Sequence, residues 1–279
     1  MSTRSKNKTR VKVKKFKGEL ASATDYLATE EPLEIRLQAA EQTRTLAVTM
    51  RTPGNDFELA AGFLLSEGVL TSRDDLKGIT YCVDKTVDEA QRYNIVNVRL
   101  RGAELPDLAG LERHFFTSSA CGVCGRAGLE GLEARGLGKL ESTFKIHPDI
   151  ITGLPNKLRE AQGLFEVTGG LHAAGLFDLS GELLQLREDV GRHNALDKLL
   201  GWAMLESQLP LKNCLLMLSG RASYELLQKA LVAGVPFVCA VSAPSSLAVD
   251  VAKRFNMTLL GFVRGETFNV YCGEERLEL

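Results

Sequence analysis

The sequence predicts a mixed α/β protein (α+β overall), with a small α+β unit in its first half and an α/β unit in its second. Residues 32–38 and 44–51 alternate apolar and polar side chains, as antiparallel strands with one solvated face do. Residues 214–218, 237–241 and 259–263 are continuously apolar and alternate with helical segments, which is typical of a largely parallel sheet covered on both faces. The length of 279 residues agrees with about two domains.

The first half begins with a basic segment and continues as a compact unit. The first 17 residues carry eight Lys or Arg and no acidic residue, which predicts a solvated, disordered arm over residues 1–20, or else a tether for an anionic partner. Asn55 or Asp56 begins a helix that ends near Gly68. Strands at 79–83 and 93–100 complete an α+β domain over 21–115, and residues 116–145 form a loop and helix segment.

The second half, residues 146–279, reads as the α/β domain. A helix runs to about residue 162, and residues 176–186 read as a hairpin around Ser180 and Gly181. Helices over 194–202, 223–232 and 245–255 separate the apolar strands. Gly220-Arg221, residues 242–244 and Arg264-Gly265 follow these strands, and ligands of such sheets bind beyond the carboxyl ends of the strands.

Composition excludes several classes of protein. The net charge of −1 identifies no partner, and nucleic acid is not expected. No apolar run approaches the ~18 residues of a membrane span, and no apolar stretch follows the basic segment as in a secretory signal. Cys82, Cys214, Cys239 and Cys272 lie in apolar runs and are expected to be buried small hydrophobic residues. Without a disulfide framework, a reducing cytoplasm is the expected compartment.

Cys121 and Cys124 are the candidate reactive thiols. They lie in the stretch SSACGVCG, whose small residues leave a thiolate accessible and free backbone N–H groups to face it. A helix beginning after Gly125 would stabilise the anion further. A Cys-x-x-Cys pair is also compatible with a redox disulfide, a buried turn, or half a zinc site completed by His172 and His193.

Two stretches predict anion binding at helix starts. Residues 187–198 (REDVGRHNALDK) place Arg192 and His193 in the first turn of a helix, where cations are unfavourable unless an anion offsets them. A solvated turn with local ion pairs is the alternative. In residues 219–225 Arg221 is the candidate phosphate ligand, and Ser223 is expected to cap the next helix. His172, after two glycines, is expected to be a structural histidine.

These blocks, taken together, resemble the formate dehydrogenase accessory sulfurtransferase (FdhD) family. The matching stretches lie in the same order along residues 30–275: GFLLSEG at 62–68, CGVCG at 121–125, TGGLH at 168–172, residues 187–198, SGRASYE at 219–225, APSSLAV at 243–249 and GFVRG at 261–265. The resemblance implies a sulfurtransferase that takes persulfide sulfur from a cysteine desulfurase. It implies delivery of that sulfur to the molybdenum cofactor, a bis-molybdopterin guanine dinucleotide, for formate dehydrogenase.

The resemblance also implies roles for individual residues. Cys121 would carry the persulfide, with Cys124 as a supporting thiol. The segment Val263, Arg264, Gly265, Glu266, Thr267 and Phe268 would contact the cofactor, helped by Arg192, His193, Arg221 and Ser223. Relatives often have a second basic residue where Thr267 stands, so Arg264 would carry more of the phosphate binding.

The family's second domain resembles the cytidine-deaminase fold, which the resemblance therefore implies for residues 146–279. Deaminases need His-x-Glu and Pro-Cys-x-x-Cys, whereas the comparable runs here are His172-Ala173-Ala174 and residues 244–248 (PSSLA). Deamination and a bound zinc are accordingly not expected. A homodimer is implied as well. Two alternatives stay open: a cofactor-binding chaperone without sulfur transfer, and a Cys/His zinc protein.

Overall fold

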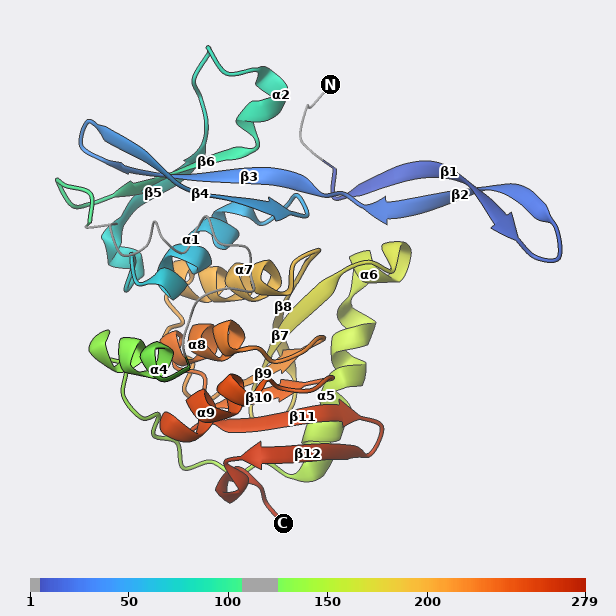
Figure 1. The fold of residues 1–279 in the computed structure, drawn as a ribbon, viewed down its shortest axis with the longest axis vertical. Coiled ribbons are helices and arrows are strands. Elements are labelled where there is room, and N and C mark those ends of the chain that lie inside the picture. The colour runs from blue at the N-terminus through green and yellow to red at the C-terminus, as the bar shows by residue number, and fades with distance from the viewer. Residues whose placement is uncertain (1–5, 107–124) are drawn as a thin grey trace.

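The protein is described here by a computed structural model that covers residues 6–106 and 125–279. Its strands form a two-stranded hairpin, a four-stranded sheet and a six-stranded sheet (Figure 1). The mixed α/β class predicted from the sequence is confirmed. Cys121 and Cys124 lie outside the described residues.

The first unit is built on the four-stranded sheet. It contains β3 (Glu31–Ala39), β4 (Gln42–Arg51), β5 (Leu76–Tyr81) and β6 (Ile95–Leu100) in the order β4-β3-β6-β5. β3 and β6 are parallel, and the other pairs are antiparallel. α1 (Asp56–Glu67) begins after Asn55 and ends at Gly68, whose φ of 78° fits the left-handed cap that glycine adopts without strain. The short α2 (Glu89–Arg92) lies between β5 and β6.

The second unit is built on the six-stranded sheet, in the order β12-β11-β10-β9-β7-β8. Its strands are β7 (His172–Phe177), β8 (Leu183–Asp189), β9 (Leu215–Leu218), β10 (Phe237–Ala240), β11 (Thr258–Arg264) and β12 (Thr267–Cys272). β9, β10 and β11 are parallel, as the sequence predicts. β7, β8 and β12 are antiparallel to their neighbours, so only the centre of the sheet is parallel.

Helices cover both faces of this sheet (Figure 1). α7 (Arg192–Leu205), α8 (Tyr224–Val232) and α9 (Ser246–Arg254) pack on one face with Leu216, Leu218 and Val238. α5 (Pro148–Ala161) packs on the other face with Leu215 and Met217. Alternate residues of one strand thus enter two different cores, which explains why these strands are apolar throughout. α4 (Gly125–Ala134) begins where a helix was expected, and α6 (Gly163–Thr168) follows α5.

The two units share one core because α1 crosses α7 at very short range. A Cβ on Gly62 would lie 1.8 Å from the carbonyl oxygen of Asp197, and one on Gly201 would lie 1.8 Å from that of Glu58. Only glycine permits this approach at both positions. Core residues of the four-stranded sheet, α1, α7 and the six-stranded sheet therefore form a single buried cluster. The residue boundaries predicted for the domains stay a prediction.

The prediction of a disordered basic arm is wrong from residue 8 onward. β1 (Lys8–Phe16) and β2 (Leu20–Ala28) pair in register through nine residue pairs. Charge counting suggests disorder, but Val11 and Val13 alternate with the cations, and this period-2 pattern favours a strand. β2 also packs against α6.

Candidate functional site

The candidate site lies along one edge of the six-stranded sheet. The parallel strands β9, β10 and β11 end at this edge. Because β7 runs antiparallel to β9 and β8 antiparallel to β7, the start of β7 and the end of β8 meet there too. From β11 to β8 this edge spans four strand spacings, or about 19 Å. It is the edge at which ligands of open α/β sheets bind.

Backbone hydrogen bonds join the loops at this edge into a continuous rim. The N–H of Ser245 donates to the carbonyl of Ala222 at 2.9 Å, which ties the β10–α9 loop to the β9–α8 loop. The N–H of Phe262 donates to the carbonyl of Ser242 at 3.3 Å, which ties β11 to the same loop. A Cβ on Gly261 would lie 3.0 Å from Pro244, so this residue allows the close approach. These contacts fix the backbone of β11 and of the two loops relative to one another.

Ser223 interacts with His193 and does not cap its helix as predicted. Its side chain makes no capping hydrogen bond to α8, and its hydroxyl lies 3.4 Å from Nε2 of His193. Nε2 of His193 also lies 3.8 Å from a carboxylate oxygen of Glu225. His193 and Ser223 act on that carboxylate and lower the pKa of Glu225 to about 2. The capping residue at this edge is Ser245, whose hydroxyl accepts from the N–H of Ala248 at 3.2 Å.

Arg192 and His172 stand beside this group. Nε of Arg192 is buried and has no hydrogen-bond partner among the described residues, and such unpaired buried groups are rare in folded proteins. His172 is half-buried at the start of β7, and a Cβ on Gly220 would lie 3.2 Å from its Nδ1. Burial, reinforced by the charges of Arg192 and His193, lowers the pKa of His172. His172 thus adds a neutral imidazole to the rim at pH 7, and its assignment as a structural histidine stays a prediction.

The predicted cofactor segment is the turn between β11 and β12. Arg264, Gly265, Glu266 and Thr267 are exposed, with Gly265 in the left-handed region at φ 57°. The Val263 side chain is fully buried in the core, so only its backbone is available to a ligand. Phe268 is half-buried and packs against the core that includes Val263.

The Arg264 guanidinium and the Arg221 side chain project from neighbouring parts of the rim. Arg264 lies 5.4 Å from the ring centroid of Phe262, whose own φ is 52°. Arg221, in the loop after β9, is exposed. β10 alone separates β9 from β11, a lateral distance of about 10 Å, and Arg264 lies three residues, or about 10 Å, beyond the level at which β9 ends. This spacing suits a ligand with several anionic groups.

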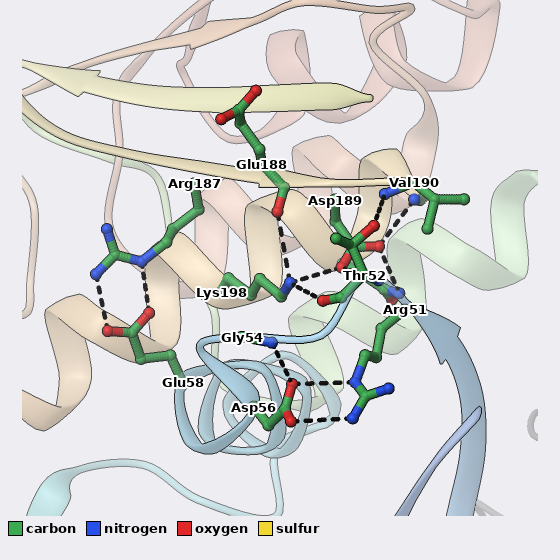
Figure 2. A network of polar contacts seen from close by, with 12 residues as sticks. Arg51, Thr52, Gly54, Asp56, Glu58, Arg187, Glu188, Asp189, Val190 and Lys198 are labelled. Carbon is green, nitrogen blue, oxygen red and sulfur yellow. Dashed lines mark hydrogen bonds and ion pairs between the residues drawn. The ribbon is translucent and has the colours of Figure 1, made fainter. Parts of the chain in front are cut away.

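A buried polar network holds the turn that carries Arg192 and His193 (Figure 2). Nζ of Lys198 lies 2.7 Å from Asp189 Oδ2 and donates to the carbonyl of Thr52 at 2.8 Å. Asp189 accepts from the N–H of Thr52 at 3.1 Å and from that of Gly191 at 2.9 Å. Lys198 and Asp189 are 2 % and 0 % exposed. The carboxylate therefore links the start of α7 to the loop between β4 and α1.

The polar residues of 187–198 thus divide into two groups. Arg187 pairs with Glu58 of α1 across an Nη2–Oε1 distance of 2.8 Å, and the Glu188 carboxylate accepts from the N–H groups of Leu164 and Phe165. The contacts of Arg187, Asp189 and Lys198 join the two units, whereas that of Glu188 joins β8 to α6 within the second unit. All four side chains are buried or half-buried. The solvated turn that stood as an alternative is therefore wrong for them. Arg192 and His193 form the second group and contribute to the rim.

The described cysteines are buried or half-buried. Cys82 and Cys239 are buried, and Cys214 and Cys272 are half-buried. Burial raises the pKa of Cys214 to about 11 and also raises the pKa of Cys239 and Cys272. Within residues 6–106 and 125–279, no cluster of His, Cys, Asp and Glu is placed to hold a metal ion. In the same residues no helix combines the length and the apolar character needed to cross a bilayer.

Comparison with known proteins identifies the family. The FdhD/NarQ family profile matches residues 28–278. The chain belongs to the FdhD/NarQ family. It is 52% identical over 265 residues to the sulfur carrier protein FdhD of Streptomyces avermitilis, covering 94% of this chain and 92% of the relative. It is 45% identical to the sulfur carrier protein FdhD of Sulfurisphaera tokodaii, covering 96% and 98%.

A solved structure shares the fold. A chain from Desulfotalea psychrophila, described as a formate dehydrogenase accessory protein, superposes with a TM-score of 0.74. The match covers 98% of this chain and all of the other at 24% identity. The resemblance to the FdhD family expected from the sequence motifs is confirmed. The finer assignment of the second unit to the cytidine-deaminase fold stays a prediction.

Proposed function

We propose that this protein is a sulfur carrier that accepts sulfane sulfur on Cys121 from a cysteine desulfurase. It passes that sulfur to the bis-molybdopterin guanine dinucleotide cofactor of formate dehydrogenase. The observation that carries the proposal is the family match over residues 28–278, which spans Cys121. Relatives named sulfur carriers align along more than nine tenths of the chain.

The accepting step is thiol–disulfide exchange with a persulfide as donor. The Cys121 thiolate attacks the outer sulfur of the desulfurase persulfide, and an S–S bond forms on Cys121 as the donor S–S bond breaks. The donor cysteine leaves as a thiolate. Cys124 is proposed as a supporting thiol. The raised pKa values of Cys214, Cys239 and Cys272 favour assigning the reactive thiol to the Cys121–Cys124 pair, because the thiolate is the nucleophile.

The rim of the six-stranded sheet is proposed to bind the cofactor, which is the substrate of this transfer. Its guanine dinucleotide arms carry phosphates, and the rim supplies Arg192 at the start of α7, Arg221 in the loop after β9 and Arg264 at the end of β11. The starts of α7 and α8 lack side-chain capping hydrogen bonds, so their first N–H groups can also face phosphate oxygens. His193 and Ser223, which contact one another, and the segment from Val263 to Phe268 complete the proposed surface.

Persulfide mass spectrometry tests the carrier role. The full chain is incubated with a cysteine desulfurase and cysteine, and the intact mass is measured with and without reductant. The wild type and the control Cys214→Ala should each gain about 32 Da, one sulfur atom, that reductant removes. Cys121→Ala should gain none. Persistence of the adduct in Cys121→Ala would remove that residue from the role.

The same samples separate carrier from chaperone. GDP, as a fragment of the cofactor, should bind Cys121→Ala as it binds the wild type, because the proposed phosphate ligands are cationic side chains and helix N–H groups and not a thiol. A wild type that binds GDP yet never gains sulfur would favour a chaperone that only holds the cofactor. We propose that the protein acts in the cytoplasm as a homodimer, with the desulfurase and formate dehydrogenase as partners.

A further inference from the structure

The β1–β2 hairpin extends away from the body of the protein (Figure 1). β1 pairs only with β2, in a sheet of two strands, so its outer edge is open within the described part of the chain. Isolated two-stranded hairpins are marginally stable in water. An open strand edge is also the usual template for a further strand.

Four cations form a row on one face of β1. Lys8, Arg10, Lys12 and Lys14 occupy alternate positions, about 7 Å apart, and all are exposed. Their cross-strand partners are Ala28, Tyr26, Thr24 and Ser22, none of which is acidic. Lys14 donates to the Ser22 hydroxyl at 2.8 Å, and no ion pair forms within the row among the described residues. The other face, with Val11 and Val13, is half-buried.

The free backbone groups of β1 belong to the same four residues. The N–H of Thr29 donates to the carbonyl of Asn7, and the N–H of Lys17 donates to that of Glu19. In an antiparallel pair, alternate residues point their N–H and C=O groups at the partner strand. The odd-numbered residues of β1 therefore face β2, and the even-numbered residues face the open edge. A strand added at this edge would place its directly opposite side chains beside the cations.

The charge of the remaining protein directs an anionic partner to this hairpin. Residues 1–28 carry eight Lys or Arg and two acidic residues, so the rest of the chain has a net charge of −7. At the base of the row, Lys6, Lys8 and Arg10 border a hollow of about 650 Å³ that Tyr26, Tyr81 and Tyr93 also line. Side chains at the end of a docked segment could bind in this partly aromatic pocket.

We propose that the open edge of β1 binds an extended acidic segment of a partner polypeptide by strand addition. Backbone hydrogen bonds form at the even-numbered residues, and carboxylates at alternate positions of the segment pair with Lys8, Arg10, Lys12 and Lys14. A polypeptide is favoured over a lipid surface or a nucleic acid because the cations and the free N–H and C=O groups belong to the same four residues. Only a second β-strand can bind the cationic side chains and the backbone groups together. The inference does not depend on the sulfur-carrier proposal.

Peptide binding to the full chain tests the row. The probe is a fluorescein-labelled eight-residue peptide with Glu and Thr alternating, and its anisotropy is followed at low salt. Lys12→Ala/Lys14→Ala should weaken binding about tenfold, the combined effect of two exposed ion pairs. Lys15→Ala/Lys17→Ala removes the same charge outside the row and should change affinity less than twofold. Equal losses in the two double variants would overturn the proposal, because a diffuse charge effect would explain them.

A proline tests the backbone contribution. Lys12→Pro removes an N–H that faces the open edge and keeps the hairpin's own hydrogen bonds, which an edge strand tolerates. Circular dichroism checks the fold. Lys12→Pro should weaken peptide binding by a further fivefold or more relative to Lys12→Ala. Equal affinities of these two variants would show that side chains alone bind the peptide and would refute strand addition.

One comparison tests the need for charge, and three exclude the other occupants. The same peptide with Gln in place of Glu should not bind. Tighter binding of a twelve-residue oligothymidylate, or of phosphatidylglycerol vesicles, than of the Glu peptide would overturn the choice of a polypeptide. Conversion of an oligomer to a monomer by Lys12→Ala/Lys14→Ala in sedimentation would assign the edge to a second copy of this chain and would also overturn it.

Discussion

Replacing Lys198 by Met tests whether the turn before α7 depends on a buried charge pair. The Lys198 ammonium lies 2.7 Å from Asp189, both side chains are almost fully buried, and the Asp189 carboxylate also accepts from Thr52 and Gly191. Methionine keeps the length and volume of the side chain but leaves Asp189 charged and without its cation. Breaking a buried pair in this way costs about 3–5 kcal/mol.

That free energy is a large share of the total stability of a domain, which is about 5–15 kcal/mol. In a protein of this size it lowers Tm by roughly 6–20 °C. Urea unfolding followed by circular dichroism gives the free energy, and thermal unfolding gives Tm. Arg254→Met is the matched control, because the pair of Arg254 with Glu133 is exposed, so its unfolding midpoint should stay close to that of the wild type.

A double variant separates the unpaired charge from lost packing. Asp189→Asn/Lys198→Met removes both charges, so it should be more stable than Lys198→Met alone, as replacement of whole buried pairs often is. The reasoning is refuted if Lys198→Met unfolds at the wild-type midpoint. It is refuted as well if the double variant is no more stable than the single one, since the cost then does not come from Asp189.

Three more predictions concern residues of the rim and one of the described cysteines. Arg221→Ala should weaken GDP binding by about 1.5–3 kcal/mol in calorimetry, the value of a hydrogen bond to a charged group. The control Arg254→Ala should leave GDP affinity unchanged. If Arg221→Ala binds GDP as tightly as the wild type, Arg221 is not a phosphate ligand. Cys214, whose pKa is raised to about 11 by partial burial, should react slowly with iodoacetamide at pH 8 in the native protein and faster after unfolding, as measured by peptide mass mapping. Equally rapid labelling of the native and unfolded protein would contradict the raised pKa. The pKa of Glu225 is lowered to about 2, so its carboxylate stabilises the fold above its ordinary pKa of about 4.3 and loses this contribution as the pH falls to about 2. His193→Ala should raise the Glu225 pKa toward the ordinary value in a carboxyl NMR titration. An unchanged titration midpoint would show that His193 is not the cause.

Local sequence determined the individual elements and the family. Gly68 ended α1 where its conformational freedom predicted, and the apolar runs at 214–218, 237–241 and 259–263 became β9, β10 and β11. Such features depend on residues a few positions apart, so periodicity and capping chemistry reveal them. The short motifs from residue 62 to residue 265, taken together and in the same order, predicted the FdhD family. They were not sufficient to place the thiols, which lie outside the described residues.

Only the tertiary structure decided which polar residues serve the fold and which face the rim. Asp189 and Lys198 meet Thr52, which is more than 130 residues away, and no local pattern encodes that contact. The antiparallel direction of β7 brings His172 to the edge where β9 ends, and the contact with His193 takes Ser223 away from the capping role that its position predicts. The physical reason is that burial and charge pairing act between segments that the sheet order brings together, whereas propensity acts along the chain.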